Sequence, residues 1–358
     1  MAYQLAEVGR RRQPLGSRGR AFSRGFMSQR QPFDLPPRTE TEHGDERRVG
    51  VEYEFTGLGI EKIAKIVKAA VGGSIEPESP YEYEIQDTPL GDFKIELDYA
   101  YLKKLGREPH EGHGGMVALE KLSEDVLAAV AKQVVPYEIV CPPVPVSRLH
   151  ELEPITEGLR EAGAQGTGES AIYAFGLHLN PELPGTDATT IRDYLRAYVV
   201  LYDWLLEVSE VDISRRVFPY IQHYGRDYLK QLTRADYGPD QAGLINDYLS
   251  HNASRNRAMD MLPLFAHLDR ARVDEAIDDG LVNARPTLHY RLPNCEIERD
   301  DWSVRIPWTH WLAVERLASD PQRLAAATRE YAEHLHSPVT GLIRGWTSRA
   351  RAWAEGSA

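Results

Sequence analysis

The sequence predicts an α+β fold in which antiparallel strand pairs alternate with helices. Segments with alternating polar and apolar residues predict the strands, and segments with apolar residues at helical spacing predict the helices. No repeat period is evident along the 358 residues. We therefore expect one domain over residues 47–353, large enough to bury a substantial core.

The composition narrows the possible partners. The formal net charge of −12 disfavours general nucleic-acid binding by the body of the protein. Two cysteines, Cys141 and Cys295, do not make a disulfide framework, and this favours a reducing compartment. No apolar run reaches the length of a membrane-spanning helix. We expect a cytoplasmic protein with no membrane and no nucleic-acid partner, and the oligomeric state stays open.

Residues 1–46 differ in composition from the rest. They are rich in arginine, Gly, Ser, Gln and Pro and hold few aliphatic residues, so we expect a disordered tail. Three interpretations stay open: a passive tail, an electrostatic tether to an acidic partner, or an over-extended start with Met27 as the true initiator.

The first strand contains the sequence VEYEF. Because side chains alternate across a strand, Glu52 and Glu54 point to one face, and apolar side chains point to the other. An amphipathic helix follows and ends at Gly72 and Gly73. The next segment predicts a β-hairpin around the turn PLGD, and Asp98 ends its second strand.

The later elements also place polar residues on strands. Glu138 lies in a strand that stops at a double proline, and His178 and Asn180 share one face of the strand GLHLN. His289 and Arg291 share one face of a last strand. The remaining predicted helices cover residues 116–134, 147–162, 189–208 and 240–268, and further helices follow from residue 307.

These polar residues suggest a metal and phosphate site. A solvated strand face is the simpler interpretation of Glu52 and Glu54 alone. Several carboxylates at close quarters, however, repel one another unless a cation neutralises them, which predicts bound Mg²⁺ or Mn²⁺. A nearby arginine fits an anionic phosphate. The chain has no Walker A or G-x-G-x-x-G motif, so ATP would be held mainly by metals and side chains. The set is Glu52, Glu54, Asp98, Glu138, His178, Asn180, His289 and Arg291.

The order of these motifs resembles the putative amidoligases, relatives of glutamine synthetase and glutamate-cysteine ligase. The motifs are GVEYEF, a strand ending in Asp98, YEIVCPP, GLHLN and TLHYRLP, and the resemblance runs from about Gly50 to Ala318. It implies a curved antiparallel sheet that forms a funnel, with helices on the outer face and the active site on the concave face.

The resemblance also implies roles for single residues. Glu52 and Glu54 match glutamates that hold two Mg²⁺ ions, and Glu138, with Asp98, matches the next acidic ligands. His178 matches a histidine that contacts metal and the terminal phosphate. The implied catalytic residues are Glu54, His178 and Arg291, the last of which stabilises the transferring phosphoryl group. The implied nucleotide or substrate contacts are Arg216, Arg257, Asn180 and Arg291.

The sequence departs from the family pattern at one metal position. The family has Glu two residues before the late Arg, and here that position is His289. Histidine prefers softer metals than Mg²⁺, so either the metal site is altered or Glu296 takes over the role. Cys141 is expected to be a buried small residue, and Trp308 and Trp311 are expected in the core.

Three functions are compatible with this pattern. The first is an ATP- and Mg²⁺-dependent carboxylate-amine ligase that forms an amide through an acyl phosphate. Its substrates would be an amine and the carboxylate of an amino acid, a peptide or a protein tail. The second is a phosphotransferase of the same fold, and the third is a catalytically silent scaffold whose tail recruits a partner.

Overall fold

The structure is a computed structural model of the chain, and it describes residues 31–97, 136–167, 175–211, 221–277, 282–337 and 345–358. Residues Pro32–Ala358 form one compact unit. Two residues singled out in the sequence, Asp98 and Arg216, lie outside the described residues, as does the helix predicted over 116–134.

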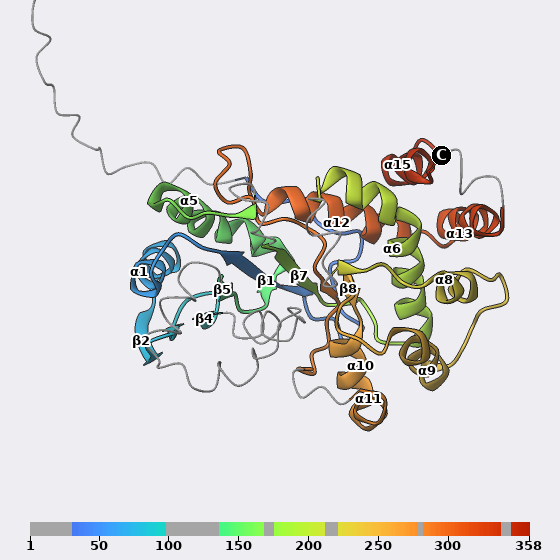
Figure 1. The fold of residues 1–358 in the computed structure, drawn as a ribbon, viewed down its shortest axis with the longest axis horizontal. Helices are drawn as coiled ribbons and strands as arrows, with labels where there is room; N and C mark the ends of the chain where they lie inside the picture. The colour runs from blue at the N-terminus through green and yellow to red at the C-terminus, as the bar shows by residue number, and fades with distance from the viewer. Residues whose placement is uncertain (1–30, 98–135, 168–174, 212–220, 278–281, 338–344) are drawn as a thin grey trace, which may run out of the picture. The chain divides into compact units, whose positions relative to one another are not determined.

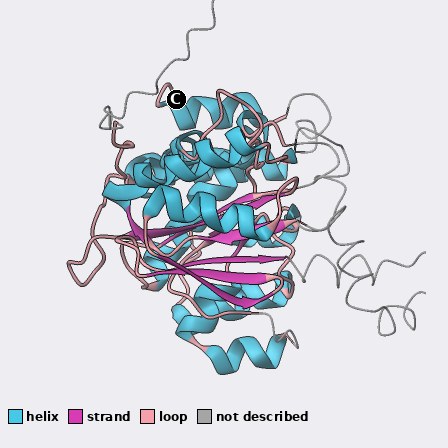
Figure 2. Ribbon diagram, turned by 90° about the vertical axis from the view of Figure 1, so that its left-hand side faces the viewer, coloured by secondary structure: helices cyan, strands magenta, loops and turns pink. Residues whose placement is uncertain are grey.

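The described strands form one open, antiparallel sheet, which gives the mixed architecture that the sequence predicts (Figures 1 and 2). Strand β1 lies near the middle of the sheet, between β5 and β7. The order across the sheet is β2-β3-β4-β5-β1-β7-β9-β8, and β6 also pairs with β1. The strands are β1 Arg48–Phe55, β2 Ser74–Ser79, β3 Glu82–Gln86, β4 Phe93–Leu97, β5 Tyr137–Val140, β6 Val144–Pro145, β7 Leu177–Pro181, β8 Met259–Asp260 and β9 His289–Tyr290.

Helices pack against this sheet. In Figure 1, α5 and α12 lie above β1 and β7, and α10 and α11 lie below β8. The helices are α1 Ile60–Val71, α5 Glu153–Ala162, α6 Ala188–Val208, α8 Arg226–Leu232, α9 Gln241–Asn252, α10 Leu262–Leu268, α11 Arg270–Ala276, α12 Arg305–Ala318, α13 Pro321–His336 and α15 Thr347–Glu355, with a 3₁₀ helix over Val146–Leu152.

The alternation in β1 sets the two faces of the sheet. Val51, Tyr53 and Phe55 are fully buried on the apolar face. Tyr53 lies 3.3 Å, oxygen to oxygen, from the hydroxyl of Thr156 in α5, and the ring of Tyr290 in β9 contacts Trp311 in α12. Both helices therefore pack on the same side, and the predicted burial of Trp308 and Trp311 is confirmed.

A buried ion pair ties the start of β1 to α12. Arg47 donates two hydrogen bonds to the carboxylate of Glu315, at 3.0 and 2.7 Å, and both side chains are almost fully buried. Tyr194 and Trp311 donate to the same carboxylate. A buried charge pair with all its partners in place is costly to break from one side. The pair thus fixes where β1 enters the sheet.

Residues 32–46, which the sequence places in the tail, lie against this body. Phe33 is buried, and the guanidinium of Arg305 lies 4.4 Å from the centre of its ring. Nε1 of Trp308 donates to the carbonyl of Asp34 at 2.8 Å. The segment is therefore anchored on α12.

The structure confirms several predicted elements and corrects others. The hairpin around PLGD is β3 and β4, and the helix that ends at Gly72 is α1. The single helix predicted over 240–268 is wrong, because β8 interrupts it where Met259 pairs with Tyr290. Strand β2 was not predicted. Its sequence, SIEPES, lacks the alternation that marks strands, and pairing with β3 extends it instead.

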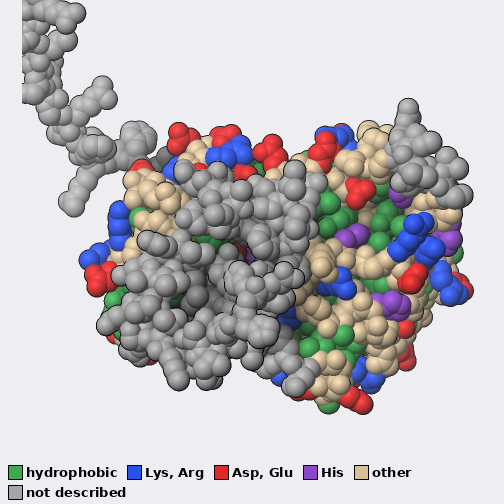
Figure 3. Space-filling view, viewed as in Figure 1, with side chains coloured by type: hydrophobic (Ala, Val, Ile, Leu, Met, Phe, Trp, Pro, Cys, Tyr) green, Lys and Arg blue, Asp and Glu red, His purple; other side chains and the backbone are tan. Residues whose placement is uncertain are grey.

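Other features of the chain agree with the sequence. Cys141 and Cys295 are both buried, and no disulfide joins them. No helix among the described residues is long and apolar enough to cross a membrane. On the face drawn in Figure 3, acidic and basic side chains are interspersed over the described surface.

Candidate functional site

The second face of the sheet gathers the polar residues that the sequence singled out. Strand β1 brings Glu54 opposite Glu138 of β5, and Glu52 opposite His178 of β7. Residues directly opposite on neighbouring strands hold their side chains on the same face. This side of the sheet, the acidic face, therefore carries the carboxylates of Glu52, Glu54 and Glu138 and the imidazole of His178.

His178 lies between two carboxylates. Its Nδ1 is 2.9 Å from Oε2 of Glu52, and its Nε2 is 3.3 Å from Oε1 of Glu54. A neutral imidazole carries one N–H, so it can donate to only one of the two. Its other nitrogen then faces a carboxylate oxygen with a lone pair, and a cation that bound both atoms would relieve this repulsion.

Glu52 is buried and ionised. Burial opposes its charge, but the imidazoles of His289 and His178, and after them the guanidinium of Arg285, hold its pKa well below the usual range. Its Oε1 accepts hydrogen bonds from Asn180 Nδ2 and Arg285 Nη1, both at 2.9 Å. The carboxylate thus has fixed orientation and keeps its negative charge.

Asn180 connects Glu52 to His289. Its Oδ1 accepts a hydrogen bond of 2.6 Å from Nδ1 of His289. Gly50 lies opposite Asn180, and a Cβ there would come within 3.3 Å of the Asn180 Cβ, so glycine leaves room for the amide. Burial and the charge of Arg291 lower the pKa of His289 well below its usual value. His289 is therefore neutral, and with its proton on Nδ1 its Nε2 presents a lone pair.

Two groups of these side chains have the spacing of metal ligands. Each residue offers one ligand atom, and within a group these atoms lie within 4.8 Å of one another. His178 belongs to both, so the two groups adjoin. The first is Glu52, His178 and His289, and the second is Glu54, Glu138 and His178.

Two arginines lie beside the groups. Arg291 is almost fully buried and follows β9, which pairs with β7 through Leu179 and Tyr290, so the register brings it next to His178. Its Nη1 donates to the carbonyl of Arg255 at 3.0 Å. Arg285 contacts Glu52, and its side chain keeps 36% of its surface exposed. Both guanidiniums are positioned to neutralise an anion near the carboxylates.

The sequence analysis missed Arg285 and Asp260. Arg285, Thr287, His289 and Arg291 alternate, and this alternation would have placed Arg285 on the same face as His289. Asp260 pairs with His289 across β8 and β9. Burial raises the pKa of Asp260 to about 6. Strand β8 is too short to show the alternation that would have identified Asp260.

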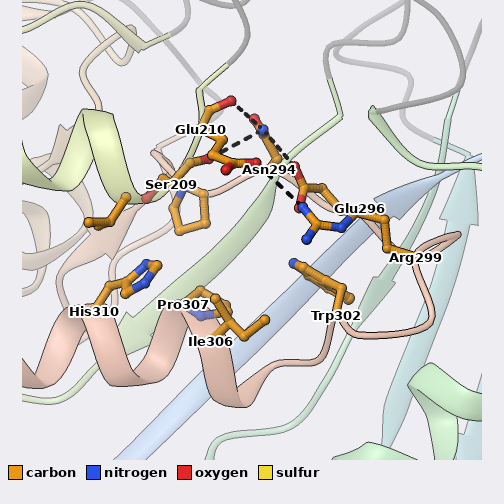
Figure 4. Close-up of a pocket in the computed structure, with 11 residues that line it drawn as sticks. Ser209, Glu210, Asn294, Glu296, Arg299, Trp302, Ile306, Pro307 and His310 are labelled. Atoms are coloured by element: carbon orange, nitrogen blue, oxygen red, sulfur yellow. Dashed lines mark hydrogen bonds and ion pairs between the residues drawn. The ribbon is translucent and has the colours of Figure 1, made fainter.

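The structure does not bring every predicted residue to this face. Glu296 belongs to neither group; its carboxylate accepts a hydrogen bond of 2.7 Å from Arg299 in a separate pocket (Figure 4). Arg257 donates to the carbonyls of His223 and His251, at 2.8 and 3.4 Å. Of the two candidates for the altered metal position, His289 is the one that lies with the carboxylates.

The chain resembles one family of known proteins. A family model described as a putative amidoligase enzyme matches residues 45–313, which contain every residue of both groups. Searches of curated proteins and of solved structures found no match to this chain. The match covers well over half of the sequence and includes the whole acidic face. The chain therefore belongs to the putative amidoligase family.

Proposed function

We propose that the protein is an ATP- and Mg²⁺-dependent carboxylate-amine ligase, a member of a ligase-type family that works on the acidic face of the sheet. The observation that carries the proposal is the pair of ligand groups that share His178, with Arg285 and Arg291 beside them. Carboxylates and guanidiniums in this arrangement suit phosphoryl transfer, in which cations neutralise oxygens on both sides of the bond that breaks. We also propose that the sheet curves into a glutamine-synthetase-like funnel and that the protein is cytoplasmic.

The residues present fit divalent cations. Glu54, Glu138 and His178 offer two carboxylates and one imidazole, a set that suits Mg²⁺ or Mn²⁺. Glu52, His178 and His289 offer two imidazoles and one carboxylate, which favours Mn²⁺ over Mg²⁺. When bound, such ions neutralise phosphoryl oxygens.

The arginines supply the remaining positive charge. Among the described residues Arg285 has Glu52 as its side-chain partner, and its Nε is buried without a hydrogen-bond partner. A guanidinium with uncommitted N–H groups can bind a carboxylate or a phosphoryl group through two parallel hydrogen bonds. We assign Arg291 to the transferring phosphoryl group and Arg285 to the substrate carboxylate.

The proposed reaction has two steps. An oxygen of the substrate carboxylate attacks the terminal phosphorus of ATP, the bond to ADP breaks, and an acyl phosphate forms. The amine nitrogen then attacks the acyl carbon, phosphate leaves with the electron pair of the C–O bond, and the amine loses a proton to a general base. The carboxylate belongs to an amino acid, a peptide or a protein tail.

Calorimetric titration with ATP tests the proposal. We expect binding with Mg²⁺ or Mn²⁺, loss of binding with EDTA, and ADP release that depends on an added amine. Glu54→Gln should abolish turnover because it removes a ligand charge without changing shape. Glu76→Gln, which removes an exposed carboxylate on β2 of the same sheet, should not.

Two outcomes would contradict the ligase. ADP release without any amine would indicate a phosphotransferase or a hydrolase. Failure to bind ATP under every metal condition would indicate a silent scaffold.

A further inference from the structure

A pocket outside both ligand groups opens between three segments (Figure 4). These are the C-terminal end of α6, the chain that follows β9, and the start of α12. The empty space is about 510 Å³, including the part that opens to solvent. One wall is polar and the other is largely apolar. The residues used below are Ser209, Glu210, Asn294, Glu296, Arg299 and Trp302.

The polar wall holds more negative than positive charge. Glu296 and Glu210 both contribute carboxylates, and Arg299 is the one Lys or Arg among the lining residues. Arg299 is already committed: Nη1 lies 2.7 Å from Glu296 and 3.5 Å from Glu210, and its Nε and Nη2 donate to Asp301. Three carboxylates therefore share one guanidinium.

The end of α6 adds to the negative potential. This helix of 21 residues ends at Val208, and its C-terminal carbonyls form the negative end of the helix dipole. Asn294 Nδ2 donates to the carbonyls of Ser209 and Glu210, at 3.4 and 3.1 Å, and this fixes the helix end on the pocket wall. Burial is the main cause that raises the pKa of Glu296; Asn294 and Arg299 oppose the rise, and the like charges of Glu210 and Glu298 add to it.

The opposite wall is apolar and aromatic. Trp302, Ile306 and Pro307 line it, and His310 continues it along α12 (Figure 4). Burial lowers the pKa of His310, so the imidazole is neutral and adds no positive charge. Aromatic side chains such as indole attract cations electrostatically as well as packing against apolar groups.

We propose that this pocket binds an organic cation, an ammonium or guanidinium group carried on an apolar stem. The charged head would lie against Glu296 and the carbonyl end of α6, and the stem would lie against Trp302 and Ile306. The helix end and the carboxylates would repel an anion, and a neutral apolar molecule would gain no attraction from them.

The pocket is separate from the acidic face but connected to it. Asn294 pairs with Gly176, and the Gly176 N–H donates to Oε2 of Glu54 at 2.6 Å. Two strand spacings, about 10 Å, therefore lie between the backbones of Asn294 and Glu54. Because the inference rests on residues outside both ligand groups, it does not depend on the ligase reaction.

A titration of the full chain with two probes tests the inference. Benzylammonium and benzyl alcohol have nearly the same shape and differ in charge. We expect benzylammonium to shift the NMR signal of the Trp302 indole saturably, and benzyl alcohol to bind at least about tenfold more weakly, since a hydrogen bond to a charged group stabilises by about 1.5–3 kcal/mol.

Matched variants show whether the contact is direct. Glu296→Gln should weaken benzylammonium binding about tenfold. Glu207→Gln removes a carboxylate near the same end of α6 that pairs with Arg351 and does not line the pocket, so it should change binding less than about twofold. Ile306→Trp, which fills the pocket, should abolish binding even if Glu296→Gln folds poorly.

Three results would overturn the inference. One is equal binding of the charged and neutral probes, and another is the absence of a saturable shift at Trp302. The third is an equal loss of benzylammonium affinity in Glu296→Gln and Glu207→Gln. Such a result would show that the probe responds only to the overall negative charge of the protein. A parallel titration with ATP and metal tests the proposed function separately, so failure of one proposal can be told from failure of the other.

Discussion

Arg285 donates a hydrogen bond of 2.9 Å to Oε1 of Glu52, although 233 residues separate the two in the chain. Glu52 also contacts His178 and Asn180, so three side chains contact its two carboxylate oxygens. A buried carboxylate held in this way keeps its charge at neutral pH. Five predictions concern this site and two buried groups elsewhere in the fold.

Arg285 should contribute to keeping Glu52 ionised. Arg285→Gln removes a positive charge from a buried carboxylate, so the pKa of Glu52 should rise. Carboxyl ¹³C NMR titration of the full chain measures this pKa. Arg272→Gln, at a surface pair with Asp269, serves as the control and should leave it unchanged. An unchanged pKa in Arg285→Gln would mean that the hydrogen bonds of His178 and Asn180 suffice.

His178 and His289 should differ in how many metal ions they affect. Because His178 belongs to both ligand groups, His178→Ala should weaken both Mn²⁺ sites, whereas His289→Ala should weaken one. Calorimetry with Mn²⁺ alone gives the stoichiometry and affinities. Loss of a single site in His178→Ala would show that the two groups do not both hold metal.

His289→Glu should shift the metal preference. Replacing an imidazole by a carboxylate converts a set of two imidazoles and one carboxylate into one with more oxygen ligands, which suits Mg²⁺ better. The ratio of Mg²⁺ to Mn²⁺ affinity should therefore rise relative to the unmodified chain. A constant ratio would show that His289 is not a ligand.

Glu315 should matter to stability more than surface carboxylates do. Glu315→Gln leaves Arg47 buried with an incomplete partner, and we expect a loss of about 3–5 kcal/mol in the free energy of unfolding. Glu330→Gln, at the surface pair with Arg349, should cost no more than about 1 kcal/mol. Urea unfolding measures both. Equal losses would contradict the role given to the buried pair.

His223 should make the fold sensitive to acid. Its ring stacks on Tyr202 at 3.7 Å between centroids, both ring nitrogens are buried without a hydrogen-bond partner, and burial lowers its pKa to about 3. Below pH 6.5 the imidazole is protonated in the unfolded chain but stays neutral in the folded chain. The free energy of unfolding therefore decreases as the pH is lowered, by up to about 1.4 kcal/mol per pH unit, until the folded pKa is reached.

The variant His223→Phe keeps the stacked ring and removes the titration. Its urea midpoint should fall less between pH 7 and pH 5 than that of the unmodified chain. The exposed His43→Gln should behave like the unmodified chain. Identical pH dependence in His223→Phe would show that other groups cause the acid sensitivity.

The sequence by itself determined which side chains share a face. Alternation in β1 places Glu52 with Glu54, and alternation in β7 places His178 with Asn180. It also determined the hairpin β3–β4 and the long helix α6, because these patterns are local and extend over several residues. Those patterns depend on the backbone geometry of each segment alone.

The tertiary structure decided which strands are neighbours, and so which side chains meet. Glu52 contacts His178 only because β1 pairs with β7, 126 residues further along the chain. It receives Arg285 because the chain before β9 passes the same face. Long-range pairing also placed Glu296 in a different pocket and interrupted the expected helix at Met259. Contacts between distant segments depend on how the whole sheet packs, and no local periodicity encodes that order.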